Sequence, residues 1–262
     1  MHPARLRLVT FDITGTLLKF RHDPVEFYAE IGRVYGVAAD VNVMDANFKR
    51  SWRELSRDHP NFGVKTGLGW ENWWSRLVKG TFRNPASCPA EETLAAISTH
   101  LIDSFRTALC WEHCDGAADL LSYLRAEGVR LGVVSNFDPR LDAILRNTEL
   151  RHYFDFVLTS YEAGAQKPEV EIFGKALRAA RVDGLRAGDC LHVGNEVDRD
   201  YLGAKNSGFR SCLVNCRERD EVADKYPQVT KGDVFSGLRD VHAHFYNNRS
   251  VYFEKSRLHN EK

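Results

Sequence analysis

The fold of this chain follows from the stretch Val9-Thr10-Phe11-Asp12-Ile13-Thr14-Gly15-Thr16-Leu17-Leu18, in which an apolar strand leads into an acidic residue and a tight turn rich in hydroxyl groups. A carboxylate at the carboxyl end of a parallel strand lies where open α/β folds bind their ligands. Such a carboxylate can attack phosphorus or carbon and form a covalent aspartyl intermediate. We therefore interpret Asp12 as a nucleophile at the end of the first strand of a parallel sheet.

Helix and strand patterns alternate in the second half of the chain. Apolar strand patterns cover residues 130–135, 154–159, 190–194 and 210–214, and helical patterns cover residues 116–127, 139–146, 169–181 and 198–207. Alternation of this kind indicates a parallel sheet covered by helices. We therefore expect an α/β core with a Rossmann-like, three-layer parallel sheet, to which the strand before Asp12 also belongs.

A block with a different pattern interrupts this core. Apolar residues recur at three- and four-residue spacing over 24–37, 40–57, 69–82 and 89–105, which indicates four helices. Asp23 is suited to cap the first of them, because Pro24 follows at the first helical position. We predict an all-helical cap domain over residues 21–109, inserted into a core domain of residues 1–20 and 110–246, with a C-terminal tail over 247–262.

Composition favours a small molecule as the ligand. The 36 basic residues balance the 36 acidic ones, so no net charge attracts nucleic acid or an anionic membrane. No run of about eighteen apolar residues and no signal-peptide pattern occurs. We expect an intracellular protein, cytoplasmic or nuclear and not secreted, that is a monomer or a homodimer and binds neither nucleic acid nor membrane.

Three later segments supply polar groups after strand patterns. They are Val133-Val134-Ser135-Asn136, Gln166-Lys167-Pro168, and the run from His192-Val193-Gly194-Asn195 to Asp200-Tyr201. In order and spacing these segments and the first stretch together resemble the haloacid dehalogenase superfamily. Within it, the layout of nearly the whole chain is similar to the group of haloacid dehalogenase-like hydrolase domain-containing protein 3, which includes the insect rhythmically expressed gene 2 proteins.

The side chains of these segments suit phosphoryl chemistry. Thr16 and the amides around Gly15 can bind phosphoryl oxygens, since glycine permits close approach of the backbone. Ser135 would add a hydroxyl group and neighbouring amides. Lys167 would place an ammonium group against Asp12 and offset the developing charge. The predicted catalytic residues are therefore Asp12 and Lys167, and the predicted substrate ligands here are Thr16, Ser135 and Asn136.

The resemblance also implies a Mg²⁺ site. In the superfamily's phosphatases the nucleophilic Asp, the backbone carbonyl two residues after it and two later acids hold the ion through oxygen ligands. The corresponding residues here are Asp12, Thr14, Asn195 and Asp200. Asn195 carries no negative charge, so we predict a weakened Mg²⁺ site, which Glu196 and Asp198 could support directly or through water.

A second departure from the superfamily concerns the general acid. Its typical phosphatases carry another Asp two residues after the nucleophile, which protonates the leaving group and then activates water. Thr14 stands there and cannot do so near neutral pH, which predicts hydrolysis slower by about two to four powers of ten. The order Asp-x-Thr-Gly-Thr also resembles the phosphorylation motif of P-type ion pumps, in which an aspartyl phosphate persists. A stable phosphoenzyme formed from an acyl phosphate is therefore a further expectation.

Three functions stay open. The one we favour is a Mg²⁺-dependent hydrolase that acts on a small phosphorylated metabolite through an aspartyl phosphate. The second is a catalytically attenuated phosphoryl-binding or regulatory protein, because Thr14 and Asn195 both remove carboxylates from one site. The third is a dehalogenase in which Asp12 attacks carbon without a metal, although the superfamily's dehalogenases have a serine-rich last motif.

Substrate choice is expected to lie in the helical cap, which can exclude water from the site. The loop at 61–67 is our candidate for the part that faces Asp12, because its two glycines allow movement and Lys65 could bind a phosphate or carboxylate. A plain surface turn is the alternative. We interpret the tryptophans of 70–74 as cap core rather than as a stacking platform.

Overall fold

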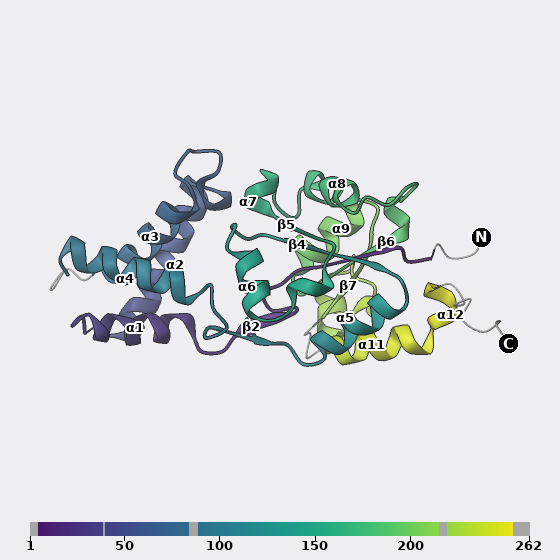
Figure 1. Cartoon of the computed structure of the whole chain (residues 1–262), viewed down its shortest axis with the longest axis horizontal. Coiled ribbons are helices and arrows are strands. Elements are labelled where there is room, and N and C mark those ends of the chain that lie inside the picture. The colour runs from purple at the N-terminus through teal and green to yellow at the C-terminus, as the bar shows by residue number, and fades with distance from the viewer. Residues whose placement is uncertain (1–4, 39, 84–88, 215–218, 254–262) are drawn as a thin grey trace. The chain divides into compact units, whose positions relative to one another are not determined.

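A computed structural model of the chain describes residues 5–38, 40–83, 89–214 and 219–253. The chain divides into two compact units (Figure 1). Of the described residues, those within 1–19, 113–136 and 149–262 form unit 1, and those within 20–112 and 137–148 form unit 2. In the described part of the chain, no helix is both long enough and apolar enough to cross a membrane.

Unit 1 is built on a five-stranded parallel sheet. In spatial order its strands are β5 (Phe156–Thr159), β4 (Arg130–Ser135), β1 (Leu8–Phe11), β6 (Cys190–Gly194) and β7 (Arg210–Leu213). The central strand β1 is buried along its whole length, as expected where helices cover both faces of a parallel sheet. The predicted Rossmann-like parallel sheet is thereby confirmed.

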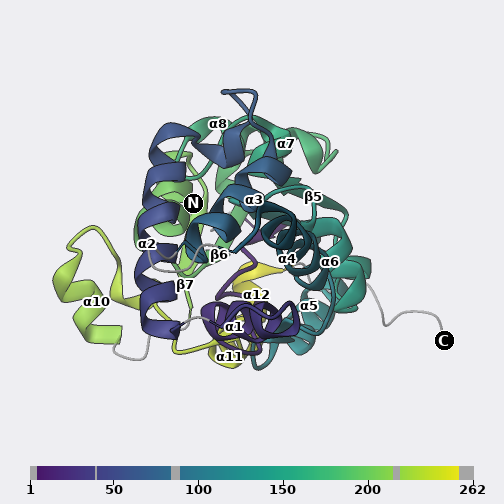
Figure 2. The ribbon, with the colours of Figure 1, turned by 90° about the vertical axis from the view of Figure 1, so that its left-hand side faces the viewer.

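Helices cover the two faces of this sheet. Figures 1 and 2 both show α8 (Val170–Ala179) on one side and α5 (Ala117–Ala126) with α11 (Leu238–Asn247) on the other. On α8, the side chains of Ile172 and Phe173 are fully buried in one cluster with residues of β1 and β4. Burial of each such side chain contributes about 1.5 to 3 kcal/mol.

Shorter helices complete unit 1. They are α7 (Ser160–Ala163), α9 (Gly203–Asn206), α10 (Arg219–Lys225), α12 (Arg249–Tyr252), the 3₁₀ helices at Arg151–Tyr153, Ala187–Asp189 and Lys231–Asp233, and a π-helix at Val197–Leu202. The sequence predicts one helix over 198–207, whereas the chain forms this π-helix followed by α9. π-helical turns are frequent at functional sites.

The C-terminal segment packs against unit 1 as far as Phe253, beyond the residue at which we predicted the tail to begin. The Leu6 N–H donates to the Tyr252 carbonyl at 2.9 Å, and Phe253 is buried with its ring 6.0 Å from that of Tyr123. Residues 247–253, which we predicted as tail, therefore belong to unit 1. The rest of the predicted tail, 254–262, lies outside the described residues.

Unit 2 contains the four helices predicted for the cap. They are α1 (Pro24–Val34), α2 (Val41–Asp58), α3 (Trp70–Thr81) and α4 (Glu91–Ser104). The Asp23 side chain accepts hydrogen bonds from the N–H groups of Val25 and Glu26, so it is the N-cap that the sequence predicts. Strands β2 (Leu18–Phe20) and β3 (Trp111–His113) form a separate two-stranded sheet.

A segment predicted in the core, residues 137–148, groups with unit 2 and contains α6 (Leu141–Asn147). Its Arg140 and Asp138 form a buried two-bond ion pair, with N···O distances of 2.9 and 2.7 Å. Trp74 Nε1 of α3 donates to Asp138 Oδ2 at 2.7 Å, and the Arg140 guanidinium lies over the Trp74 ring at 4.7 Å. These contacts attach the segment to the cap helices.

Replacing Arg140 with Met is expected to destabilise unit 2 by about 3 to 5 kcal/mol, because the Asp138 carboxylate then stays buried without its counter-charge. Tryptophan fluorescence during urea unfolding measures the loss. The control is the double variant Asp138→Asn/Arg140→Met, which removes both charges and should recover most of the stability. Equal stability of the single variant and the wild type would contradict the prediction.

Candidate active site

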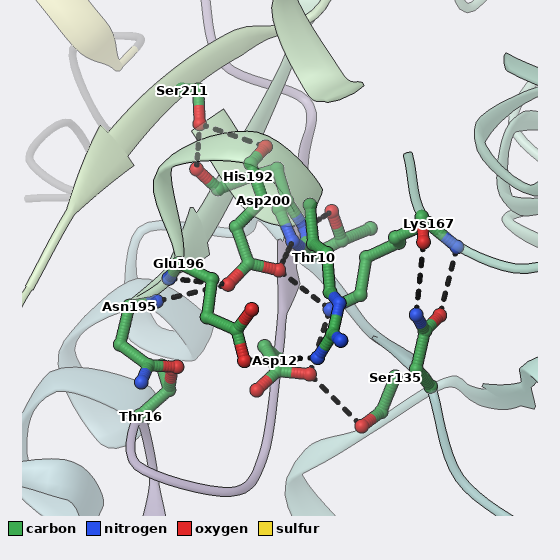
Figure 3. A network of polar contacts seen from close by, with 12 residues as sticks. Thr10, Asp12, Thr16, Ser135, Lys167, His192, Asn195, Glu196, Asp200 and Ser211 are labelled. Atoms are coloured by element: carbon green, nitrogen blue, oxygen red, sulfur yellow. Dashed lines mark hydrogen bonds and ion pairs between the residues drawn. The ribbon is translucent and has the colours of Figure 1, made fainter. Parts of the chain in front are cut away.

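Several of the predicted site residues lie at the carboxyl ends of adjacent strands in unit 1 (Figure 3). Asp12 follows β1, Ser135 ends β4 and Asn195 follows β6. Lys167 comes from the segment between α7 and α8. Because β1 lies between β4 and β6, the parallel strands bring these residues to one edge of the sheet.

Asp12 is held by hydrogen bonds on one side only. It is 8 % exposed, and its N–H donates to the Val193 carbonyl of β6 at 2.9 Å. Its Oδ1 accepts from Ser135 Oγ at 2.9 Å and from Lys167 Nζ at 2.7 Å. Within the described part of the chain, Oδ2 accepts no such bond. Asp12 therefore has one oxygen fixed by donors and one available to attack an electrophile.

Lys167 bridges two carboxylates. Its Nζ donates to Asp12 Oδ1 at 2.7 Å and to Asp200 Oδ1 at 2.6 Å, and the side chain is buried. Burial alone lowers the pKa of Lys167, but Asp12 and Asp200 outweigh it and hold this pKa above its ordinary value. The Lys167 side chain is therefore a charged ammonium group.

Asn136, predicted as a substrate ligand, holds the backbone of Lys167. Its Oδ1 accepts from the Lys167 N–H at 2.8 Å, and its Nδ2 donates to the Lys167 carbonyl at 2.9 Å. Both ends of the amide are thus engaged. The geometry gives Asn136 the role of positioning Lys167 beside Asp12.

Asp200, predicted as a metal ligand, uses both carboxylate oxygens for hydrogen bonds. Its Oδ1 accepts from Lys167 and lies 3.2 Å from His192 Nε2, and its Oδ2 accepts from the N–H groups of Asn195 and Glu196 at 3.0 and 2.9 Å. Burial raises the pKa of Asp200, but Lys167 and His192 outweigh it and hold this pKa below its usual range. The ionised Asp200 carboxylate is therefore the ion-pair partner of Lys167 in this geometry.

The turn after Asp12 is closed by its own hydrogen bonds. The N–H groups of Gly15 and Thr16 donate to the carbonyls of Leu18 and Ile13 at 2.7 and 3.1 Å, although we predicted such amides as phosphoryl ligands. Thr16 is buried, and its hydroxyl donates to Asn195 Oδ1 at 3.2 Å. Gly15 has φ +80°, and a Cβ there would lie 2.6 Å from Asn195 Nδ2, so glycine is required.

Two residues that stand in the quoted motifs, but to which sequence reasoning gave no role, join this network. Thr10 of β1 and His192 of β6 are register partners, both fully buried, with Thr10 Oγ1 2.9 Å from His192 Nδ1. Burial lowers the pKa of His192, so the ring is neutral. The sequence signal for each of them is a polar residue inside an apolar strand. It does not reveal that Thr10 pairs with His192, because that pairing depends on the order of the strands in the sheet.

Oxygen atoms beside Asp12 are of the kind that Mg²⁺ binds. Within the described residues, no group of three or more His, Cys, Asp or Glu is arranged to hold a metal ion. Mg²⁺ is commonly bound by one or two carboxylates together with other oxygens and water. The Asp12 carboxylate and Asn195 Oδ1, which also accepts from Thr16, supply oxygens of this type, and Figure 3 shows the Glu196 carboxylate pointing toward Asp12. The donor chemistry of Asp12, Asn195 and Glu196 fits Mg²⁺, whereas both oxygens of Asp200 are engaged by other donors.

Lys65 lies in unit 2, exposed, in the loop after the 3₁₀ helix Asn61–Gly63. Within that 3₁₀ helix, the Phe62 ring packs 5.3 Å from the Trp73 ring, and Trp73 is buried with its Nε1 donating to the His59 carbonyl at 3.0 Å. Trp73 thus belongs to the cap core. The role of Lys65 toward a substrate stays a prediction.

Sequence comparisons agree with the motifs. The family model described as haloacid dehalogenase-like hydrolase matches residues 6–208. The chain is 41 % identical to the Rhythmically expressed gene 2 protein of Drosophila melanogaster over 246 residues, which are 91 % of this chain and 95 % of that protein. It is 38 % identical to the human Haloacid dehalogenase-like hydrolase domain-containing protein 3 over 213 residues, 81 % of this chain and 83 % of that protein.

Solved structures show the same fold in enzymes of two kinds. They are the magnesium-bound hydrolase YfnB of Bacillus subtilis (TM-score 0.64, 19 % identity, 92 % of this chain and 99 % of that one), a phosphatase of Thermococcus onnurineus (0.57, 22 %, 92 % and 98 %) and the L-2-haloacid dehalogenase of Xanthobacter autotrophicus (0.63, 19 %, 93 % and 99 %). At such identities the likeness shows the fold alone.

Proposed function

This chain belongs to the haloacid dehalogenase-like hydrolase family, as its motifs predict, and we propose from that premise that it is a slow Mg²⁺-dependent phosphatase of a small phosphorylated metabolite. The observation that carries the proposal is the asymmetric binding of Asp12. Ser135 and Lys167 hold its Oδ1, while its Oδ2 has no protein donor in the described part of the chain.

The proposed reaction has two steps. Asp12 Oδ2 attacks phosphorus, the bond to the leaving oxygen breaks, and the leaving group departs as an anion that takes its proton from solvent, which leaves an aspartyl phosphate. Water then attacks that phosphorus, the bond to Asp12 Oδ2 breaks, and the proton lost by the water passes to solvent, which returns phosphate and the free carboxylate. Lys167 is placed beside the reacting oxygens and offsets charge that develops on them. Mg²⁺, when bound by oxygens of Asp12, Thr14, Asn195 and Glu196, would supply further charge neutralisation.

The identity of residue 14 should limit the rate. Thr14→Asp is expected to raise the rate of hydrolysis of p-nitrophenyl phosphate about 10- to 100-fold, because a carboxyl group can protonate the leaving oxygen and activate water. Phosphate release under steady-state conditions measures this. Thr14→Asn is the matched control, since its side chain has the shape of Asp but no acid. A gain of equal size in both variants would show that acid catalysis is not what Thr14 lacks.

Asn195→Asp is expected to lower the Mg²⁺ concentration required for half-maximal activity by about tenfold, since a carboxylate adds negative charge where an amide stands. Glu196→Gln should raise that concentration. Titration of activity and of bound Mg²⁺ measures both shifts. The control is Asp240→Asn, which alters an exposed carboxylate of unit 1 that is not among the predicted or supporting ligands. An unchanged Mg²⁺ requirement in both Asn195→Asp and Glu196→Gln would contradict the proposed ligand set.

Acetyl phosphate and p-nitrophenyl phosphate, each with and without Mg²⁺, provide the direct test of the function. We expect Mg²⁺-dependent phosphate release and a covalent phosphoenzyme that builds up with acetyl phosphate, because Thr14 does not assist its hydrolysis. The second candidate function, an attenuated phosphoryl-binding protein, is favoured by the two carboxylates missing at Thr14 and Asn195. It predicts binding of phosphate esters without turnover.

A further inference from the structure

We propose that Thr10 and His192 are positioning residues for the ammonium group of Lys167. They act through Asp200, by a buried chain of hydrogen bonds that begins in the middle of β1 and ends at the site (Figure 3). The inference rests on the proposed function, because that function gives Lys167 its role beside Asp12.

The His192 ring is fully buried, which favours its neutral form, and in that form the chain of hydrogen bonds runs in one direction. Asp200 Oδ1 lies 3.2 Å from His192 Nε2, and an ionised carboxylate can only accept, so Nε2 carries the proton and donates. In a neutral ring Nδ1 then has a free lone pair and accepts from the Thr10 hydroxyl, 2.9 Å away. The Asp200 carboxylate thus selects the tautomer of His192, and the Thr10 hydroxyl, whose other acceptor is the Leu191 carbonyl at 3.4 Å, supports it by donating to Nδ1.

The held carboxylate in turn sets the place of Lys167. The Asp200 Oδ2 is anchored by two backbone N–H groups, and its Oδ1 is shared between the His192 ring and the Lys167 ammonium group. A Cβ at Gly194 would lie 2.2 Å from Asp200 Cγ, so the carboxylate fills a space that only glycine leaves. Loss of the His192 donor removes one constraint on the Oδ1 that binds Lys167.

His192 also packs against neighbours, since the Phe173 ring lies edge-on at 5.3 Å. The test must therefore separate packing from hydrogen bonding. His192→Leu keeps an apolar side chain but removes the donor, whereas His192→Gln keeps an N–H group able to reach Asp200. Thr10→Val and Thr10→Ser form a second pair, without and with the hydroxyl group.

Steady-state kinetics of the full chain with acetyl phosphate give the first readout. We expect His192→Leu to lower kcat about 10- to 100-fold, as is typical for loss of a group that orients a reacting residue, with a smaller change in KM. The kcat of His192→Gln and of Thr10→Ser should lie within severalfold of the wild-type value. The kcat of Thr10→Val should be lowered, as it is in His192→Leu. Equal losses in the Leu and Gln variants, with circular dichroism showing both folded, would overturn the proposal.

A double-mutant cycle with Asp200→Asn gives the second readout. If His192 acts through Asp200, adding His192→Leu to Asp200→Asn should lower kcat little further, because the Asp200 carboxylate is already absent. Additive losses would mean that the two residues act separately and would overturn the proposal. This cycle distinguishes a positioning role from a general loss of stability.

A measurement that needs no turnover completes the test. Long-range ¹H–¹⁵N spectra of the ¹⁵N-labelled wild type should show His192 as the neutral tautomer protonated at Nε2, with its signals shifted in Asp200→Asn and Thr10→Val but not in Thr10→Ser. A ring protonated at Nδ1 would overturn the proposal. If the wild type hydrolyses neither substrate, the proposed function fails, while these spectra still decide whether the hydrogen-bonded chain exists as described.

Discussion

Asp12→Asn is expected to lose turnover of acetyl phosphate and p-nitrophenyl phosphate by at least about four powers of ten, the range seen when a nucleophile is removed from an enzyme. An amide retains the shape of the side chain but is a far weaker nucleophile than a carboxylate. Its carbonyl oxygen can still accept from Ser135 and Lys167, so the variant should stay folded. Phosphate release with and without Mg²⁺ measures the loss.

The control for Asp12→Asn is Asp119→Asn, which neutralises an exposed carboxylate in the same unit and should leave the rate unchanged. Radiolabelled acetyl phosphate adds a direct test, because an aspartyl phosphate is stable in acid and is released by hydroxylamine. We expect labelling of the wild type that is absent from Asp12→Asn. Hydroxylamine-sensitive label on the variant would place the nucleophile at another carboxylate.

Much of the site could be predicted because it lies in short segments at strand ends. In a parallel sheet the carboxyl ends of all strands lie at one edge, so Asp12, Ser135 and Asn195 could be expected together once the strand patterns were recognised. The same argument does not say which partner each side chain chooses. The carboxylate of Asp200 is a typical ligand for a metal ion, which is why we predicted it as one. In the structure it binds the ammonium group of Lys167, which comes from a separate loop.

What could not be predicted depends on neighbours far apart in sequence. Thr10 and His192 are separated by 182 positions and meet only because β6 lies beside β1. Segment 137–148 follows a core strand, and its alternation with strands predicts a core helix. It groups with the cap because Asp138 meets Trp74, a partner 64 residues away. Local patterns carry no information on either contact.

Lys167→Met is expected to damage both activity and stability. Loss of the ammonium group should lower kcat by about 10² to 10³, as for removal of one electrostatic donor from an active site. It also leaves Asp12 and Asp200 buried without their shared counter-charge, which should cost about 3 to 5 kcal/mol in the free energy of unfolding. Lys205→Met is the control, because Lys205 pairs with Asp233 at a partly exposed site and its ion pair should contribute little.

The stability lost in Lys167→Met should depend on pH in a direction that follows from Asp200. In the wild type, burial raises the pKa of Asp200 but Lys167 and His192 outweigh it, so this pKa is lowered on folding. The ionised carboxylate therefore stabilises the wild type above its unfolded pKa of about 4, and that contribution is lost as the pH falls.

In the variant the balance at Asp200 reverses, because burial then acts without the ammonium group. The carboxylate disfavours folding when ionised, and protonation at low pH relieves the cost. The difference in unfolding free energy between wild type and Lys167→Met should thus be largest near neutral pH and shrink below about pH 5. Urea unfolding at a series of pH values measures it. A difference that stays constant from neutral pH to pH 4 would mean that Lys167 stabilises the site by packing and not by its charge.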